Sequence, residues 1–151
     1  MNNLRTRLET DMKAALKARD AQRLGVIRMA LAAIKQREID SGHRDGLSDT
    51  EALGVIERMI KQRREAAEQF KTGGREESAE KEQYEARVLG DYLPEPIDSE
   101  TLDAEIANVL HESGATGRRD MGKVMGLLKA RLAGRADMGE VSKRVRERLT
   151  D

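Results

Sequence analysis

DMGKVMGLLKARLAGRADMGEVSKRVRERL, residues 120–149, combines two helix patterns with a short turn between them. Apolar residues recur every three or four positions in each half: Met121, Val124, Met125, Leu128 and Leu132, then Val141, Val145 and Leu149. Such spacing places the apolar side chains on one face of a helix. The stretch therefore predicts two amphipathic helices that each bury one face.

The turn between these patterns is Gly134-Arg135-Ala136-Asp137. Gly134 suits the left-handed position after a helix, and Asp137 with Glu140 forms a capping-box pattern for the next helix. These structural roles leave Arg135 unexplained. The exposed amides of a helix start favour anions, so Arg135 beside them indicates a phosphate ligand. A solvated arginine, or a salt bridge of little value, is the alternative.

The same periodicity continues toward the N-terminus and predicts an all-α protein. The chain is poor in aromatic and β-branched residues and rich in strong helix formers, which disfavours strands. A first helix over about 3–17 is expected to bury a stripe that ends at Leu16. The acidic helix over about 76–89 is expected to bury little beyond Tyr84 and Val88. Further helices are expected after Asp20, from the Ser48–Glu51 capping box to Phe70, and after Asp98, Asp120 and Asp137.

The two prolines of the chain, Pro94 and Pro96, mark a boundary. Neither fits inside a helix, and each biases the preceding residue toward an extended backbone. We therefore expect an N-terminal domain of about four helices at 1–93. A small C-terminal domain of three helices is expected at 97–151.

Composition excludes several classes of site. The chain has no cysteine and two histidines, His43 and His111, so we expect no disulfide, no metal site and no cofactor. Neither histidine has a convincing catalytic partner in the sequence, and no phosphate-binding glycine loop or dinucleotide fingerprint occurs. No signal-peptide pattern and no membrane-length apolar run is present, so a cytoplasmic location without membrane association is expected.

Charge is balanced overall and uneven along the chain. There are 28 basic and 28 acidic residues, which disfavours a purely electrostatic nucleic-acid binder. Residues 1–37 carry nine basic and three acidic residues, and residues 113–151 carry ten basic and five acidic ones. The acidic residues gather between these two basic regions.

The C-terminal basic residues are candidate RNA contacts. They are Arg118, Arg119, Lys123, Lys129, Arg131, Arg135, Lys143, Arg144, Arg146 and Arg148. An ordinary solvated face is one interpretation, and a phosphate-contacting surface is the other. Residues 93–151 contain no aromatic residue, so stacking of bases on rings is excluded there. Any RNA contact is expected to read backbone and shape.

Small residues form a strip on the first of these helices. Gly122, Gly126 and Ala130 are spaced four residues apart, although glycine inside a helix costs roughly 1 kcal/mol relative to alanine. Close packing of another helix is the favoured explanation, because small residues are common at such contacts. Close approach of an RNA backbone is the alternative.

Several segments together resemble the YqeY family of bacterial proteins. They are RLGVIRMALAAIK at 23–35, the Leu47-Ser48-Asp49 helix start, IKQRREAAEQF at 60–70, Gly73-Gly74-Arg75, Tyr92-Leu93-Pro94, MGKVM at 121–125, GRAD at 134–137, and Val141 with Val145. The C-terminal half of that family is homologous to the tail domain of the B subunit of tRNA-dependent amidotransferases. The resemblance implies an N-terminal helical domain and a small three-helix domain, and it points toward tRNA.

These observations predict a non-catalytic accessory protein that binds tRNA through its C-terminal domain and assists an aminoacyl-tRNA-handling enzyme. Nothing in the chain resembles the catalytic portion of the amidotransferase, so an amidotransferase label would describe the relatives' complex. A protein–protein adaptor that docks through Met121, Met125 and Met138 is the alternative, and a hidden enzyme is the third.

Overall fold

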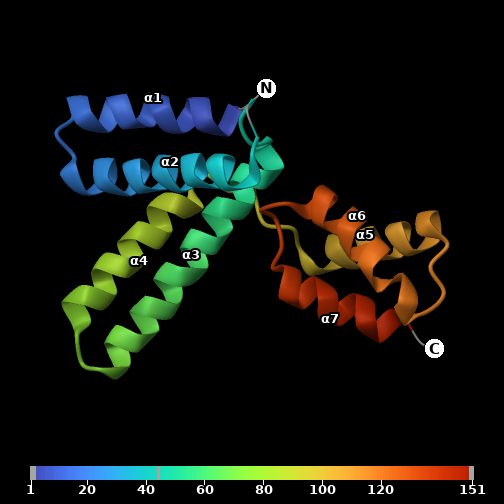
Figure 1. Ribbon diagram of the computed structural model, residues 1–151. Helices are drawn as coiled ribbons and strands as arrows, with labels where there is room; N and C mark the ends of the chain where they lie inside the picture. Colours follow the sequence, from blue (N-terminus) through green and yellow to red (C-terminus); the bar gives the residue numbers. More distant parts are fainter. Residues whose placement is uncertain (1–2, 44, 150–151) are drawn as a thin grey trace. The chain divides into compact units, whose positions relative to one another are not determined.

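The computed structural model describes residues 3–43 and 45–149, and this part of the chain is all-helical, as the sequence predicts (Figure 1). It divides into two compact units, residues 1–93 and 94–151. The first unit contains α1 (Asn3–Lys17), α2 (Ala21–Ser41), α3 (Asp49–Thr72) and α4 (Glu76–Gly90). The second contains α5 (Ser99–Ser113), the 3₁₀ turn η1 (Arg118–Asp120), α6 (Met121–Leu132) and α7 (Met138–Arg148).

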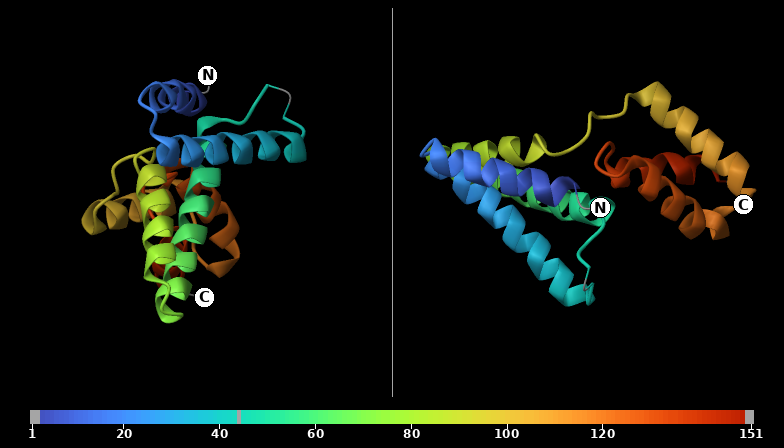
Figure 2. Two further views of the ribbon diagram at one scale, coloured as in Figure 1. Left: turned by 90° about the vertical axis from the view of Figure 1, so that its left-hand side faces the viewer. Right: turned by 90° about the horizontal axis from the view of Figure 1, so that it is seen from above.

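Unit 1 consists of two helix pairs. The helices α3 and α4 form an antiparallel hairpin and lie side by side in the left-hand view of Figure 2, and α1 packs along α2. The expectation for α4 was wrong, because it also buries Ala79, Glu85, Ala86 and Leu89. Ala79 and Ala86 lie among acidic residues. A search for large apolar side chains therefore does not reveal the apolar face of α4. Leu16 of α1 is 58% exposed, because Ala15 occupies the buried position instead.

Unit 2 buries one apolar face from each of its three α-helices. The core includes Ile106 and Val109 of α5, Val124 and Leu128 of α6, and Val145 of α7, all fully buried. These residues have the spacing that the sequence shows. Because α6 has 12 residues and α7 has 11, neither is long enough to be stable alone in water, and mutual packing of these faces holds the unit together.

Side-chain caps begin most of the helices as expected. Asp20 and Asp98 accept from the amides of Arg23 and Thr101, and Ser48 forms the capping box with Glu51. The backbone N–H of Thr101 holds the pKa of the Asp98 carboxyl below its usual value.

The other two expected caps in the C-terminal unit, Asp120 and Asp137, differ from the expectation. Asp120 turns away from α6, and its carboxylate accepts from the amides of Thr116 and Gly117 in the preceding loop. Asp137 accepts from the Gly139 amide over 3.1 Å, and Glu140 is paired with Arg144. The expectation that Asp120 caps α6 was therefore wrong, and so was the capping box of Asp137 with Glu140, although Asp137 does cap α7.

Polar contacts inside unit 1 tie its two ends together. The Tyr92 hydroxyl donates to Asp11 of α1 over 2.5 Å, and burial together with this bond raises the pKa of Tyr92 above its usual value. The Arg7 guanidinium lies 4.6 Å from the Tyr92 ring centroid and donates to the carbonyl of Asp91 over 2.8 Å. These contacts fix the chain that leaves α4 against α1.

A buried ion pair joins α1 to α2. The Glu38 side chain is 7% exposed and pairs with Arg5, whose side chain is 31% exposed. Replacing Arg5 by methionine leaves this carboxylate buried beside an apolar side chain. We expect the free energy of unfolding to fall by about 1–3 kcal/mol, because a buried charge loses its partner. Chemical denaturation followed by circular dichroism measures this change.

The double variant Arg5→Met with Glu38→Met is the control for this prediction. It removes both charges together, so its midpoint should lie closer to that of the wild type than the midpoint of Arg5→Met alone. A double variant that loses as much as the two single variants combined would show that the two charges do not interact.

Candidate nucleic-acid interface

The outer face of α6 is a smooth strip between two lysines. Gly122, Gly126 and Ala130 are all exposed. At 3.6 residues per turn, Lys129 lies on one side of this strip and Lys123 lies on the other. Both lysines are exposed. The outer face of α6 therefore has small side chains along its centre and a positive charge at each edge.

The glycines of this strip make no packing contact that needs them. A Cβ atom added at Gly122 or at Gly126 meets nothing within 4 Å. The favoured expectation, that a neighbouring helix packs closely here, is therefore wrong for the described part of this chain. The apolar side of α6 faces the core through Val124, Leu128 and Leu132, and the small residues lie on the opposite side. Their cost to helix stability has no compensation within the unit.

Two of the predicted RNA-binding arginines bridge helices within unit 2. Arg131 pairs with Glu112 and with Glu105 of α5. Arg144 reaches Asp103 over 3.0 Å and also donates to the carbonyl of Ser99, while Glu140 accepts from its Nε. The hydrogen bond to Glu140 is the main reason why the pKa of Arg144 is raised. These arginines connect α6 and α7 to α5, so their charge is largely offset by carboxylates.

Arg135 also has a structural partner. Its Nε donates to the carbonyl of Glu95 over 3.3 Å, and its own carbonyl accepts from the Ile97 amide over 2.9 Å. The turn thus holds the segment that enters unit 2. Gly134 adopts φ of +75°, the left-handed conformation that the sequence predicts.

The remaining candidate cations differ in how strongly they are held. Arg148 lies 3.7 Å from Asp103, and Arg146 donates to Ser142 over 3.4 Å. Lys123 donates to the carbonyl of Ser113 over 3.3 Å, and its charge also acts on the nearby carboxylate of Asp120.

Three further candidates, Arg119, Lys129 and Lys143, are exposed, and no ion pair joins them to another described residue. Arg118, also exposed, lies in η1 just before α6. Of the exposed candidates without an ion pair in the described ranges, Arg119 and Lys129 lie at the start and along the outer face of α6, and Lys143 lies on α7.

Sequence reasoning missed the partners of His43. Its Nδ1 lies 2.8 Å from Ser41 Oγ and 3.6 Å from Glu51. Ser41 Oγ also lies 2.6 Å from the carbonyl of Arg37, to which it donates. Both His43 contacts use the same ring nitrogen, and the serine proton is already donated elsewhere. This arrangement differs from a nucleophile–base–orienter relay, in which the two ring nitrogens have different partners.

The methionines proposed for docking are partly covered. Met121, Met125 and Met138 are half-buried and pack against the core of unit 2. Leu127 on α6 is 39% exposed, which is ordinary for a single surface leucine. Over residues 3–43 and 45–149, no cluster of three or more potential metal ligands occurs, and no helix has the length and apolarity needed to cross a bilayer.

Comparisons with known proteins confirm the resemblance. The model of the family described as "Yqey-like protein" matches residues 5–149. Relatives named "Altered inheritance of mitochondria protein 41, mitochondrial" include those of Lachancea thermotolerans, 34% identical over 70% of this chain and 57% of the relative, and Eremothecium gossypii, 38% identical over 72% and 60%. The relative from Pyrenophora tritici-repentis is 30% identical over 93% of this chain and 78% of its own length.

The match to these relatives is partial, and their names give a different cellular location. The chain spans less than two thirds of the length of the first two relatives. The relatives are eukaryotic and their name places them in mitochondria, so they do not support the expectation of a bacterial, cytoplasmic protein.

The exposed strip predicts an unusual response to mutation. Replacing Gly126 by alanine should raise the free energy of unfolding of unit 2 by about 1 kcal/mol, because alanine favours the helix and the added methyl meets open space. Gly134→Ala is the matched contrast and should destabilise the unit, because φ is positive there. Denaturation of the full chain measures both changes. A destabilised Gly126→Ala would show that the glycine is needed for folding.

The contacts of Arg144 predict that this arginine stabilises unit 2, whereas the exposed Lys143 does not. Arg144→Met should lower the unfolding midpoint, because it removes the contacts between α7 and the start of α5. Lys143→Met, at the neighbouring exposed position, should leave the midpoint unchanged. Thermal unfolding of the two variants gives this comparison. Equal midpoints would mean that the Arg144 contacts contribute nothing to stability.

Proposed function

Because the chain belongs to the Yqey-like protein family, we propose that it is a non-catalytic accessory protein that binds tRNA through the outer face of α6. One observation carries this proposal: Gly122, Gly126 and Ala130 are exposed between two lysines, and a Cβ atom added at either glycine would meet nothing within 4 Å. Glycine in an exposed helix is explained when another backbone must approach it closely.

A sugar–phosphate backbone has the shape and the charge that this face accepts. The glycines leave the helix surface low, so that a polyanionic strand can lie close to it. Lys123 and Lys129 then reach phosphates from opposite edges, and Arg119 extends the positive charge beyond the start of the helix. Contacts of this type position a folded RNA without reading its bases. The lack of aromatic residues in 93–151 agrees with recognition of backbone and shape.

The helix-bridging arginines have a supporting part in this proposal. Arg131 and Arg144 hold α6 and α7 against α5, and so keep the strip in place. Their ion pairs with carboxylates reduce their value as phosphate contacts. RNA binding is therefore assigned mainly to Arg119, Lys123 and Lys129, with Lys143 and Arg146 on the neighbouring helix in addition.

The client of such a protein is an enzyme that handles aminoacyl-tRNA. The proposal places the protein where tRNA is used, either in the cytoplasm, as the sequence suggests, or in mitochondria, the compartment in the relatives' name. A weak affinity is expected, because the net charge of the chain is zero.

Binding of the full chain to unfractionated tRNA across a salt series tests the proposal. The logarithm of the affinity should fall with the logarithm of salt concentration, with a slope of about −0.7 to −0.9 for each phosphate contact. The variant Lys123→Ala with Lys129→Ala should flatten this slope by about 1.5, the loss of two contacts. Gly126→Leu should weaken binding without a change in charge, because its side chain occupies the strip.

Matched controls separate the surface from general charge. Lys61→Ala with Lys71→Ala removes the same charge from α3, and Gly54→Leu adds the same side chain at an exposed helical glycine of that helix. Both controls should bind tRNA as the wild type does. If the wild type fails to bind tRNA at low salt, the proposal is wrong, and a search for a protein partner of the adaptor type takes its place.

A further inference from the structure

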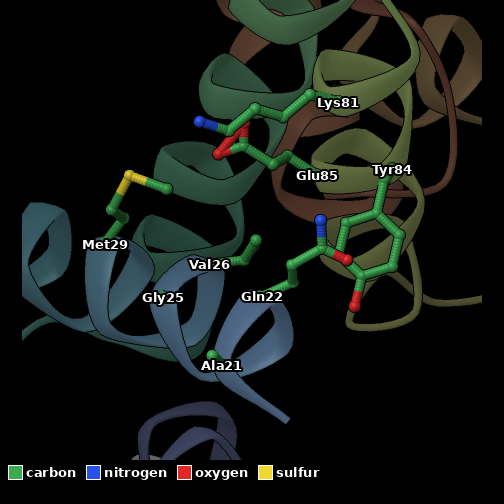
Figure 3. Close-up of a pocket in the computed structure, with 8 residues that line it drawn as sticks. All are labelled: Ala21, Gln22, Gly25, Val26, Met29, Lys81, Tyr84 and Glu85. Carbon is green, nitrogen blue, oxygen red and sulfur yellow. The ribbon is translucent and has the colours of Figure 1, made fainter. Parts of the chain in front are cut away.

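A groove in unit 1 lies outside the proposed RNA-binding face. It runs between α2 and α4 and has a volume of about 320 Å³, within the range of sites for small molecules. Figure 3 shows Gly25, Val26 and Met29 of α2 on one wall, and Lys81 and Glu85 of α4 on the other. The α2 wall is apolar at these three positions with Gln22 beside them, and the α4 wall carries two opposite charges beside Tyr84.

The carboxylate of Glu85 is the unusual group in this groove. The residue is 8% exposed, and no ion pair or hydrogen bond joins its carboxylate to any other residue in the described ranges. The residue as a whole is buried, but its carboxylate oxygens stay accessible in the groove, because Nε of Arg63 is the one fully buried side-chain nitrogen or oxygen without a partner in the described ranges. The groove thus contains an acceptor without a protein donor.

A cation accompanies this carboxylate on the same wall. Lys81 lies one turn before Glu85, is exposed, and extends to the same side of the groove (Figure 3). The two side chains form no ion pair. Near the α2 wall, Nη2 of Arg63 donates to the Met29 sulfur over 3.6 Å, and the buried Nε of Arg63 has no partner. A ligand with only a positive charge would therefore meet Lys81 beside the carboxylate of Glu85.

We propose that this groove binds a small zwitterion with an apolar side chain, namely an apolar α-amino acid. Its ammonium group donates to Glu85, and its carboxylate accepts from Lys81. Its side chain packs against Val26 and Met29. Gly25 keeps the groove open, because a Cβ atom at that position meets nothing within 4 Å. This inference concerns unit 1 and is independent of the proposed binding of tRNA by unit 2.

Three ligands of one carbon skeleton test the charge pattern: leucine, isopentylamine and 4-methylpentanoate. Titration calorimetry with the full chain should show leucine binding at least about tenfold more tightly than either singly charged analogue, the effect of one charged hydrogen bond. Glu85→Gln should weaken leucine and the amine about tenfold and leave the acid unchanged. Lys81→Met should weaken leucine and the acid and leave the amine unchanged or tighter.

Variants that alter the walls complete the test. Gly25→Leu should abolish leucine binding by filling the groove, whereas Gly54→Leu, at a helical glycine with equally open surroundings, should bind leucine normally. Glu80→Gln is the matched control for the carboxylate. Circular dichroism checks that each variant is folded. The proposal is overturned if leucine fails to bind up to its solubility limit, if the amine binds as tightly as leucine, or if binding survives in folded Gly25→Leu.

Discussion

Burial of one narrow apolar face per helix is the constraint on which both units depend. Among the described residues of unit 2, no helix exceeds 15 residues, so each helix would be only marginally stable alone and the apolar faces must meet. Val124, Leu128 and Val145 lie fully inside that contact. With the inner face committed to packing, only the outer face of each helix is available for function. The division of α6 into an apolar side and a glycine–lysine side follows from this constraint.

The cations of unit 2 fall into two groups, those that form ion pairs between helices and those that are exposed to solvent. Arg131 and Arg144 hold helices together through carboxylates on α5, whereas Lys129 stands exposed on α6. A positive net charge in a segment therefore overstates the charge available to a ligand. The partition depends on which acidic residues the fold brings near, and those residues lie up to about 40 positions away in the chain (Arg144 and Asp103, for example).

Much of the architecture was predictable from the sequence. Periodic apolar residues and the Ser48–Glu51 capping box are local signals, and they identified the helices and several of their starts. Leu16 and the alanines of α4 were misjudged, because burial of a small residue depends on its neighbours in space and not on its own size. The partners of Arg144 and His43 could not be predicted from the sequence for a related reason, because tertiary packing creates these contacts. The glycine strip was recognised, but its exposure required the structure.

The outer face of α6 also has a consequence for motion. Two glycines within 12 residues leave the helix backbone less shielded from water and more costly to hold in order. Local opening of unit 2 should therefore begin in this helix, and its amide protons should exchange with solvent sooner than those of α5. A ligand that covers the strip would close this opening by mass action. Binding of a ligand to the strip would therefore be coupled to local folding of α6, and the bound helix would be more ordered than the free one.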